Sequence, residues 1–169
     1  MTKRIDLHNL YQRKENLSEL HDDIIEIILF QISEIDKLFE EYDSFFQNMN
    51  YDDPSLIDKT VIGSILHSFY NGIENIFETI SKNIDNFVPS GNKTHKEILN
   101  NIYVGNEKRT AIIDKETYNL LMDYLGFRHF YRHSYSFHLN WEKLKPLVAN
   151  LSMTWNKAKE QIKFFMDSN

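Results

Sequence analysis

The sequence predicts an all-α fold, an antiparallel helical bundle of four to five helices. Apolar residues recur every three or four positions over long stretches, which is the period of an amphipathic helix. Strand-like alternation of apolar and polar residues is almost absent, and 5 Gly and 3 Pro leave little material for hairpin turns. A chain of 169 residues can bury one substantial core, so we expect a single domain over 1–169.

The first predicted helix follows a polar N-terminal segment. Residues 1 to about 17 are weakly periodic, and we expect a short helix or an irregular lead-in there. From 20 to 46 the apolar positions follow helical intervals and predict a core-facing helix. These positions are Ile24, Ile25, Ile28, Ile32, Ile35, Leu38, Phe39, Tyr42, Phe45 and Phe46.

A second long helix is predicted between Asp53 and about Phe87. Asp53 is a plausible N-cap and Pro54 suits the first helical position. Gly72 lies inside this helix, where it costs about 1 kcal/mol relative to Ala, so we expect another helix to approach closely there. Residues 89–92, Pro-Ser-Gly-Asn, interrupt the helical pattern.

A short helix and an irregular segment come next. Thr94 and Glu97 have the spacing of a capping box, which predicts a helix that ends near residue 102. The following residues, 103–113, are irregular and carry the basic pair Lys108 and Arg109.

Two further helices complete the bundle. Asp114 can cap a helix that begins at Lys115 and extends as far as His138. Asn140 can cap the last helix, and Pro146 lies near its start, where a missing N–H is best tolerated in the first turn.

The composition excludes several classes of protein. A formal net charge of −6 argues against a general nucleic-acid coat protein, which needs a basic face. The absence of cysteine excludes disulfides and thiolate–zinc sites, and the absence of a glycine-rich phosphate loop leads us to expect no cofactor. Neither a signal peptide nor a run of roughly 18 apolar residues is present, so we expect a cytoplasmic protein without a membrane span.

The segment 127–135 carries the strongest chemical signal. On a helix with 100° per residue, its two arginines, two histidines and terminal tyrosine occupy an arc about 160° wide. Arginine binds phosphate oxygens with a planar fork, and histidine transfers protons near neutral pH. The segment therefore indicates a site for a phosphodiester. The residues are Arg128, His129, Arg132, His133 and Tyr135.

Two other interpretations of this segment stay open. Cations near a helix C-terminus interact favourably with the helix dipole and need no further function. His129 and His133, at i and i+4, could share a zinc ion, although no third ligand is evident and the flanking arginines would repel a dication. Elsewhere, His67 is expected to be a packed, hydrogen-bonded histidine, and Glu74 to pair with a base on an unidentified neighbouring helix.

The motif resembles that of a known family. Arg128 to His133 fits Arg-polar-x-x-x-His, the signature of HEPN-domain ribonucleases, with His129 as the polar residue. The continuation to Tyr135 gives Arg-x4-His-x-Tyr, which resembles the HepT toxins of the HEPN/MNT toxin–antitoxin systems. Segments 67–78, 89–99 and 127–141 extend the resemblance, which covers about 20–165.

The resemblance implies a metal-independent endoribonuclease that acts as a homodimer, with two motif helices facing each other across a two-fold axis. His133 would be the main proton-transfer group, and Arg128 would hold the scissile phosphate. His129 would orient Arg128 or act as a second acid or base, and Arg132 would add phosphate affinity. Because the chemistry uses the 2′-hydroxyl, RNA such as tRNA or mRNA would be cut and DNA spared.

The resemblance also implies a partner. In HepT-like toxins an MNT-type nucleotidyltransferase antitoxin attaches AMP to the matching tyrosine, which makes Tyr135 the expected target here. AMP would place bulk and negative charge beside the arginines and block RNA. The alternative from another class is a catalytically silent HEPN scaffold that binds a partner protein or a nucleotide.

Overall fold

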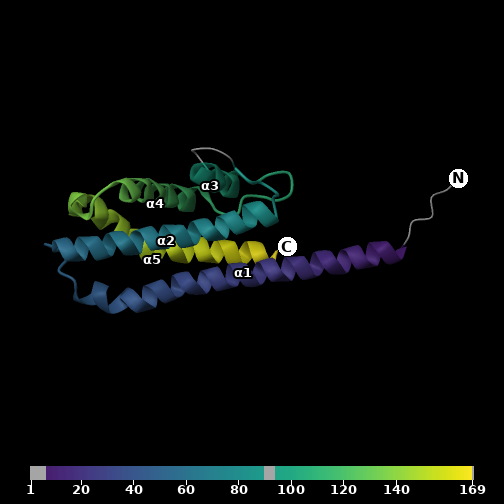
Figure 1. Cartoon of the computed structure of the whole chain (residues 1–169), viewed down its shortest axis with the longest axis horizontal. Helices are drawn as coiled ribbons and strands as arrows, with labels where there is room; N and C mark the ends of the chain where they lie inside the picture. The colour runs from purple at the N-terminus through teal and green to yellow at the C-terminus, as the bar shows by residue number, and fades with distance from the viewer. Residues whose placement is uncertain (1–6, 90–93, 169) are drawn as a thin grey trace.

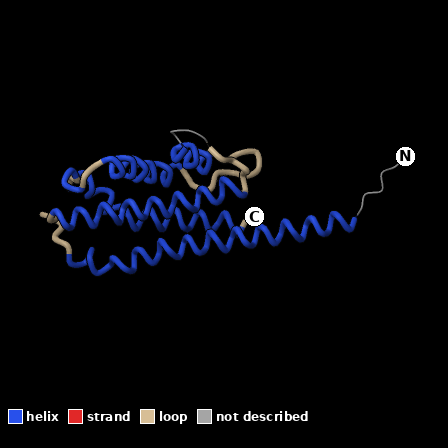
Figure 2. Tube along the Cα trace, in the orientation of Figure 1, coloured by secondary structure: helices blue, strands red, loops and turns tan. Residues whose placement is uncertain are grey.

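The computed structural model describes residues 7–89 and 94–168, with side chains from Asp22 onward. Over these ranges the chain is helical and contains no strand (Figure 2), which confirms the all-α prediction. The elements in chain order are α1 Leu7–Asn48, α2 Leu56–Asn83, α3 Thr94–Val104, α4 Lys115–His133, the short 3₁₀ helix η1 Ser136–His138 and α5 Trp141–Asp167 (Figure 1).

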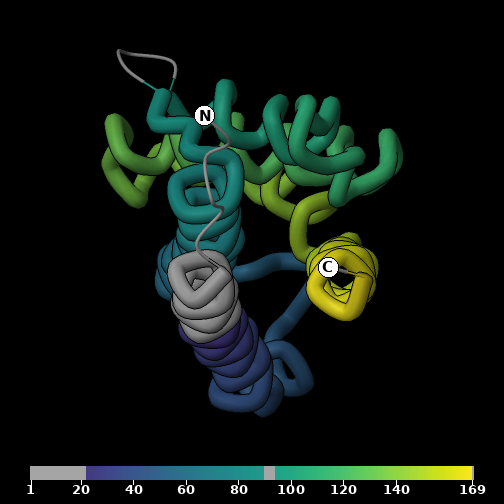
Figure 3. The backbone as a smooth tube through the Cα atoms, turned by 90° about the vertical axis from the view of Figure 1, so that its right-hand side faces the viewer, coloured from purple at the N-terminus to yellow at the C-terminus, as the bar shows by residue number. Residues whose placement is uncertain are grey.

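Helix α2 is the centre of the bundle. It packs against α1, α3, α4 and α5, and Figure 3 shows α1 and α5 on one side of it and the α3–α4 layer on the other. Successive long helices run antiparallel, so α2 and α5 point in the same direction (Figure 1). Because four helices cover α2, its apolar residues are buried around most of its circumference, among them Leu66, Phe69, Ile73, Phe77 and Ile80.

Glycines mark two close approaches to α2. A Cβ added at Gly72 would lie 2.6 Å from Cγ1 of Ile35 in α1, which confirms the close helix approach predicted there. A Cβ at Gly63 would lie 2.8 Å from Cε2 of Tyr131 in α4 and 3.0 Å from Cδ1 of Leu139. The second approach sets how near the motif helix comes to α2.

The predicted starts of α4 and α5 are confirmed, and those of α1 and α2 are wrong. Asp114 caps α4 by accepting from the Thr117 N–H at 2.7 Å, and Asn140 caps α5 by accepting from the Glu142 N–H at 2.8 Å. Helix α1 begins at Leu7, so of the two alternatives for residues up to about 17 the helix is found from Leu7 on, as part of one long helix, and the irregular lead-in is not. Residues 1–6 lie outside the described chain.

The start of α2 is displaced from its predicted cap. Ser55, and not Asp53, is the N-cap: its Oγ accepts from the Asp58 N–H at 3.1 Å, and Asp58 Oδ2 accepts from the Ser55 N–H at 2.8 Å. This reciprocal capping box satisfies two N–H groups, so it outweighs the signal from Pro54 at the first helical position. The helix ends at Asn83, before the predicted Phe87.

Two details of the later helices also differ from prediction. Helix α3 continues to Val104, and residue 93, where its cap would be, lies outside the described residues. Pro146 lies inside α5, in its second turn and not its first.

Helix α4 stops at His133 and does not reach His138 as predicted. Ser134 and Tyr135 are extended, with φ/ψ of −121°/151° and −80°/150°, and η1 follows. Leu139, immediately after η1, is 5% exposed and packs beside Gly63 of α2. Because the chain ends α4 at His133 and changes direction, Leu139 can be buried and α5 can begin.

None of the helices in the described part of the chain is long and apolar enough to cross a membrane.

Candidate active site

Helix α2 holds the first arginine of the motif. Arg128 Nε donates to Asn71 Oδ1 at 2.9 Å and lies 3.0 Å from Glu74 Oε2. Its side chain is 12% exposed, and among the described residues no hydrogen bond is found for its terminal nitrogens, Nη1 and Nη2. The guanidinium is thus held at Nε, and its terminal nitrogens are the N–H donors that could serve a ligand.

Glu74 joins three helices at this point. The residue is 4% exposed, its Oε2 contacts Arg128 of α4, and its Oε1 contacts His95 Nδ1 of α3. A buried carboxylate is stable only when it is paired and hydrogen-bonded, and these two partners meet that need. The predicted pairing of Glu74 with a base on a neighbouring helix is therefore confirmed, and the partners are now identified.

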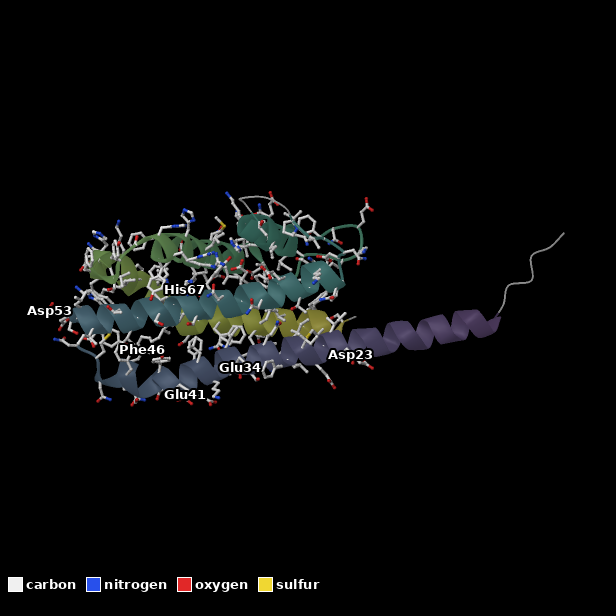
Figure 4. The ribbon with its side chains drawn as sticks, in the orientation of Figure 1. Asp23, Glu34, Glu41, Phe46, Asp53 and His67 are labelled. Carbon is white, nitrogen blue, oxygen red and sulfur yellow. The ribbon has the colours of Figure 1, made fainter. Side chains whose placement is uncertain are left out.

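His67 extends the polar network along α2. Asn71 Nδ2 lies 3.2 Å from His67 Nδ1, and the His67 ring centroid lies 5.0 Å from that of Tyr131. Figure 4 shows His67 projecting from α2 toward α4. The expectation of a packed, hydrogen-bonded histidine is confirmed, but its buried Nε2 has no hydrogen-bond partner among the described residues.

A pocket of about 460 Å³ lies between α2 and α4 beside this network. Its walls carry positively charged arginines and negatively charged glutamates, which suits a ligand that is anionic and also donates hydrogen bonds. It is lined by His67, Asn71, Glu74, Asn75, Glu78, Arg128 and Arg132.

The two histidines near the pocket are shifted toward their neutral forms. Burial lowers the pKa of His67, and the positive charges of Arg128 and Arg132 lower it further. The same causes, in the same order, lower the pKa of His95, whose Nδ1 contacts Glu74 Oε1. Burial and Arg132 also lower the pKa of Arg128, against the opposing effect of Glu78.

The structure divides the predicted cationic arc into two parts. Arg128 and Arg132 line the pocket, whereas His129 and His133 are exposed and form their own pair, with ring centroids 5.1 Å apart. His133 is five residues after Arg128 and so points about 140° away around the helix. Within one copy of the chain, His133 therefore points away from the side of the helix on which Arg128 lies.

Tyr135 is not on the motif helix. The prediction that it shares the helical arc of Arg128 is wrong, because α4 ends at His133 and Tyr135 has an extended backbone. Its side chain is 72% exposed and stacks on Phe137, with ring centroids 5.3 Å apart and planes at 6°.

The residues that could hold a metal ion do not include the His129–His133 pair. In the described chain, one group of three residues could hold an ion: donor atoms of Glu74, Glu78 and His95 lie within 4.8 Å of one another, and no third ligand joins His129 and His133. Arg128 already contacts Glu74, and its positive charge opposes a dication at the same oxygen.

Sequence reasoning missed Asn71 and Glu78, although a signal for them exists. His67, Asn71, Glu74 and Glu78 recur at intervals of four, three and four residues. That spacing forms one polar stripe on a helix whose buried residues are mostly apolar. Such a stripe on a central helix indicates a buried polar site.

The fold and the arginine–histidine helix define a HEPN-type helical protein, and a comparison with family models gives the particular family. The model described as "HepT-like protein" matches residues 61–169. This is more than half of the chain, so the chain belongs to the HepT-like family, whose context is that of toxin–antitoxin systems. The match contains the whole of the candidate site and leaves out α1. No curated protein and no solved structure matches the chain.

Proposed function

We propose that this chain is a metal-independent endoribonuclease toxin whose phosphate-binding group is Arg128. One observation carries the proposal: α2 holds Arg128 at Nε, through Asn71 and Glu74, and the arginine lines a pocket. A guanidinium fixed in this way binds two phosphate oxygens with little loss of side-chain entropy. Family membership supports the same site, because the motif Arg-x4-His lies within the matched residues.

The proposed reaction is an internal transesterification. The ribose 2′-oxygen forms a bond to phosphorus, and the bond from phosphorus to the 5′-oxygen breaks. A base takes the 2′-hydroxyl proton and an acid gives a proton to the leaving oxygen, so the products end in a 2′,3′-cyclic phosphate and a 5′-hydroxyl. Arg128 stabilises the charge that develops on the phosphate, and Arg132 adds affinity for the phosphate.

The proton-transfer group is His133, with His129 as a second acid or base. Because His133 points away from the Arg128 pocket of its own chain, the proposal requires a homodimer. Across a two-fold axis, the exposed histidine pair of one motif helix can approach the arginines of the other. This geometry makes catalysis depend on dimerisation.

The proposed control is AMP transfer by a nucleotidyltransferase antitoxin: the Tyr135 hydroxyl bonds to the α-phosphorus of ATP, and pyrophosphate leaves. A hydroxyl on a side chain that is 72% exposed is accessible to such a partner. The added phosphodiester brings negative charge close to the last turn of α4, which carries Arg132 and His133. RNA would then compete with a covalently attached anion.

The test is cleavage of labelled tRNA and total RNA in EDTA by four proteins: wild type, Arg128→Ala, His133→Ala and Lys145→Ala. Lys145 is exposed on α5 away from the pocket and controls for the loss of a positive charge. Wild type and Lys145→Ala should cut, and the two motif variants should lose at least 100-fold, the usual contribution of acid–base catalysis.

Intact mass must first show that Tyr135 is free of AMP. If folded, unmodified wild-type dimer leaves every RNA intact, the ribonuclease assignment is wrong and the silent scaffold becomes the better description. If cleavage requires a metal ion, the metal-independent mechanism is wrong.

A further inference from the structure

Three exposed rings follow the motif helix directly. Tyr135 and Phe137 are 72% and 64% exposed, and their rings are parallel to within 6°. His138 lies against Phe137, with centroids 4.5 Å apart. These three residues, here named the aromatic cluster, expose their rings to solvent.

The aromatic cluster is held by an ordered turn. The His138 N–H donates to the Tyr135 carbonyl at 2.9 Å, and the Leu139 N–H donates to the Ser136 carbonyl at 3.0 Å. Leu139 is buried beside α2, and Asn140 caps α5. Both ends of the turn are thus fixed to the bundle, which positions the rings without burying them.

The surroundings of the aromatic cluster are cationic. Arg132 and His133 form the last turn of α4, immediately before it, and both are exposed. The segment 127–141 contains no acidic residue. Positive charges next to stacked rings are the combination by which proteins bind single-stranded nucleic acid, because the charges follow the phosphates and the rings stack on the bases.

We propose that the aromatic cluster is a nucleobase-binding subsite, on which an unpaired base of single-stranded RNA stacks while its phosphate contacts Arg132. This inference rests on the proposed ribonuclease function and specifies its substrate as RNA with accessible, unpaired bases. A duplex keeps its bases stacked internally and cannot use the subsite. Every base has a π face, so the subsite tolerates sequence and selects for single strands.

The test uses wild-type protein and 2′-O-methyl oligonucleotides that carry 2-aminopurine, either single-stranded or in a duplex. The 2′-O-methyl group removes the proposed nucleophile, so binding is measured without cleavage. The proteins are wild type, Phe137→Leu, Phe137→Trp and Phe164→Leu. Phe164 is 74% exposed on α5, far along the chain from the motif helix, and controls for the loss of an exposed ring.

Stacking should quench 2-aminopurine fluorescence when the single strand binds. Phe137→Leu should weaken binding of the single strand about 10-fold and abolish quenching, Phe137→Trp should preserve both, and Phe164→Leu should match wild type. Equal binding and quenching by Phe137→Leu and wild type would overturn the inference. Preference for the duplex would also overturn it.

A second copy of this chain could cover the aromatic cluster in place of a base. Light scattering on the same proteins distinguishes these two occupants. A shift from dimer to monomer in Phe137→Leu would show that the aromatic cluster is covered by that copy, and the nucleobase subsite would be wrong. Failure of the proposed function has a different signature: wild type would stack on the single strand and yet leave unmodified RNA uncut.

Discussion

Arg128 Nε and Glu74 Oε2 lie 3.0 Å apart, an ion pair between the motif helix α4 and the central helix α2. Glu74 is 4% exposed, and its second oxygen contacts His95 of α3. The position of the motif arginine is therefore determined by residues outside the motif. Any change at Glu74 should affect stability and RNA cleavage together.

Glu74→Ala should lower the free energy of unfolding by about 1–3 kcal/mol, because it removes the contacts of the buried carboxylate with Arg128 and His95. Cleavage should fall about 10-fold because Arg128 loses one of its two anchors. Urea unfolding and initial cleavage rates measure the two effects. Glu34→Ala, at an exposed position on α1 (Figure 4), is the control and should change neither. Unchanged values in both assays for Glu74→Ala would contradict a positioning role.

Arg128→Lys tests the geometry of the fork and not the charge. A lysine ammonium has one nitrogen, so it cannot contact Asn71 and Glu74 and at the same time bind two phosphate oxygens. We expect kcat to fall at least 10-fold. Arg132→Lys should mainly raise KM, because Arg132 lines the pocket without an ion pair among the described residues. Steady-state kinetics on a short RNA measures kcat and KM separately. Similar changes of kcat and KM in both lysine variants would refute the different roles of Arg128 and Arg132.

Local signals predicted most of the fold. Helical periodicity identified the long helices, and the capping-box spacing of Thr94 and Glu97 identified α3. The caps at Asp114 and Asn140 were found because each depends on residues two or three positions away. The end of α4 could not be predicted in the same way. It depends on the burial of Leu139 beside Gly63, a contact between residues 76 positions apart in sequence.

The candidate site was predictable in composition but not in arrangement. The motif identified Arg128, Arg132 and the two histidines, yet the partners of Arg128 come from α2, 54 and 57 positions earlier in the chain. Helical geometry put Arg128 and His133 on one broad arc, but it could not show that packing against α2 would bury one end of that arc and expose the other.

Gly63 and Gly126 should respond oppositely to alanine. A Cβ at Gly63 would lie 2.8 Å from Tyr131 in the motif helix, so Gly63→Ala should cost about 1–3 kcal/mol through overpacking. Gly126 lies inside α4 with no atom within 4 Å of an added Cβ, so Gly126→Ala should stabilise the chain by about 1 kcal/mol through helix propensity. Thermal unfolding of the two variants gives the comparison. Equal shifts of Tm in one direction would contradict the packing of α4 against α2.

Stability should fall as the pH is lowered through and below 6.5. Burial and the positive charges of Arg128 and Arg132 lower the pKa of His67 and of His95 from 6.5, so the folded state favours both neutral imidazoles. As the pH falls, the two histidines bind protons in the unfolded chain before they do so in the folded chain. Their contribution to the free energy of unfolding is therefore complete above pH 6.5, and it is lost as the pH falls through the lower pKa values of the folded state. Tm measured from pH 7.5 to 5.0 tests this. His67→Gln should flatten the profile, and a wild-type Tm that rises toward pH 5.0 would reverse the predicted sign.

A second ion pair, Asp85–Arg109, fastens the segment between α3 and α4. Arg109 donates from Nε and Nη2 to the two oxygens of Asp85 at 2.9 and 2.6 Å, and their side chains are 2% and 1% exposed. Arg109 also donates to the carbonyls of Thr110 and Asn101. The basic pair in 103–113 thus includes a structural residue, although no local pattern distinguishes Arg109 from Lys108.

Removing one partner of this pair should be among the most damaging changes in the chain. Arg109→Met leaves the Asp85 carboxylate buried without its cation and should cost roughly 3–5 kcal/mol in urea unfolding. Asp85→Asn combined with Arg109→Met should cost less than the sum of the two single changes, because neither charge is then left uncompensated. Lys108→Met is the control: Lys108 Nζ reaches only backbone carbonyls, at 3.1 and 3.4 Å, and should contribute under about 1 kcal/mol. Equal costs for Arg109→Met and Lys108→Met would mean that the buried pair does not hold the segment in place.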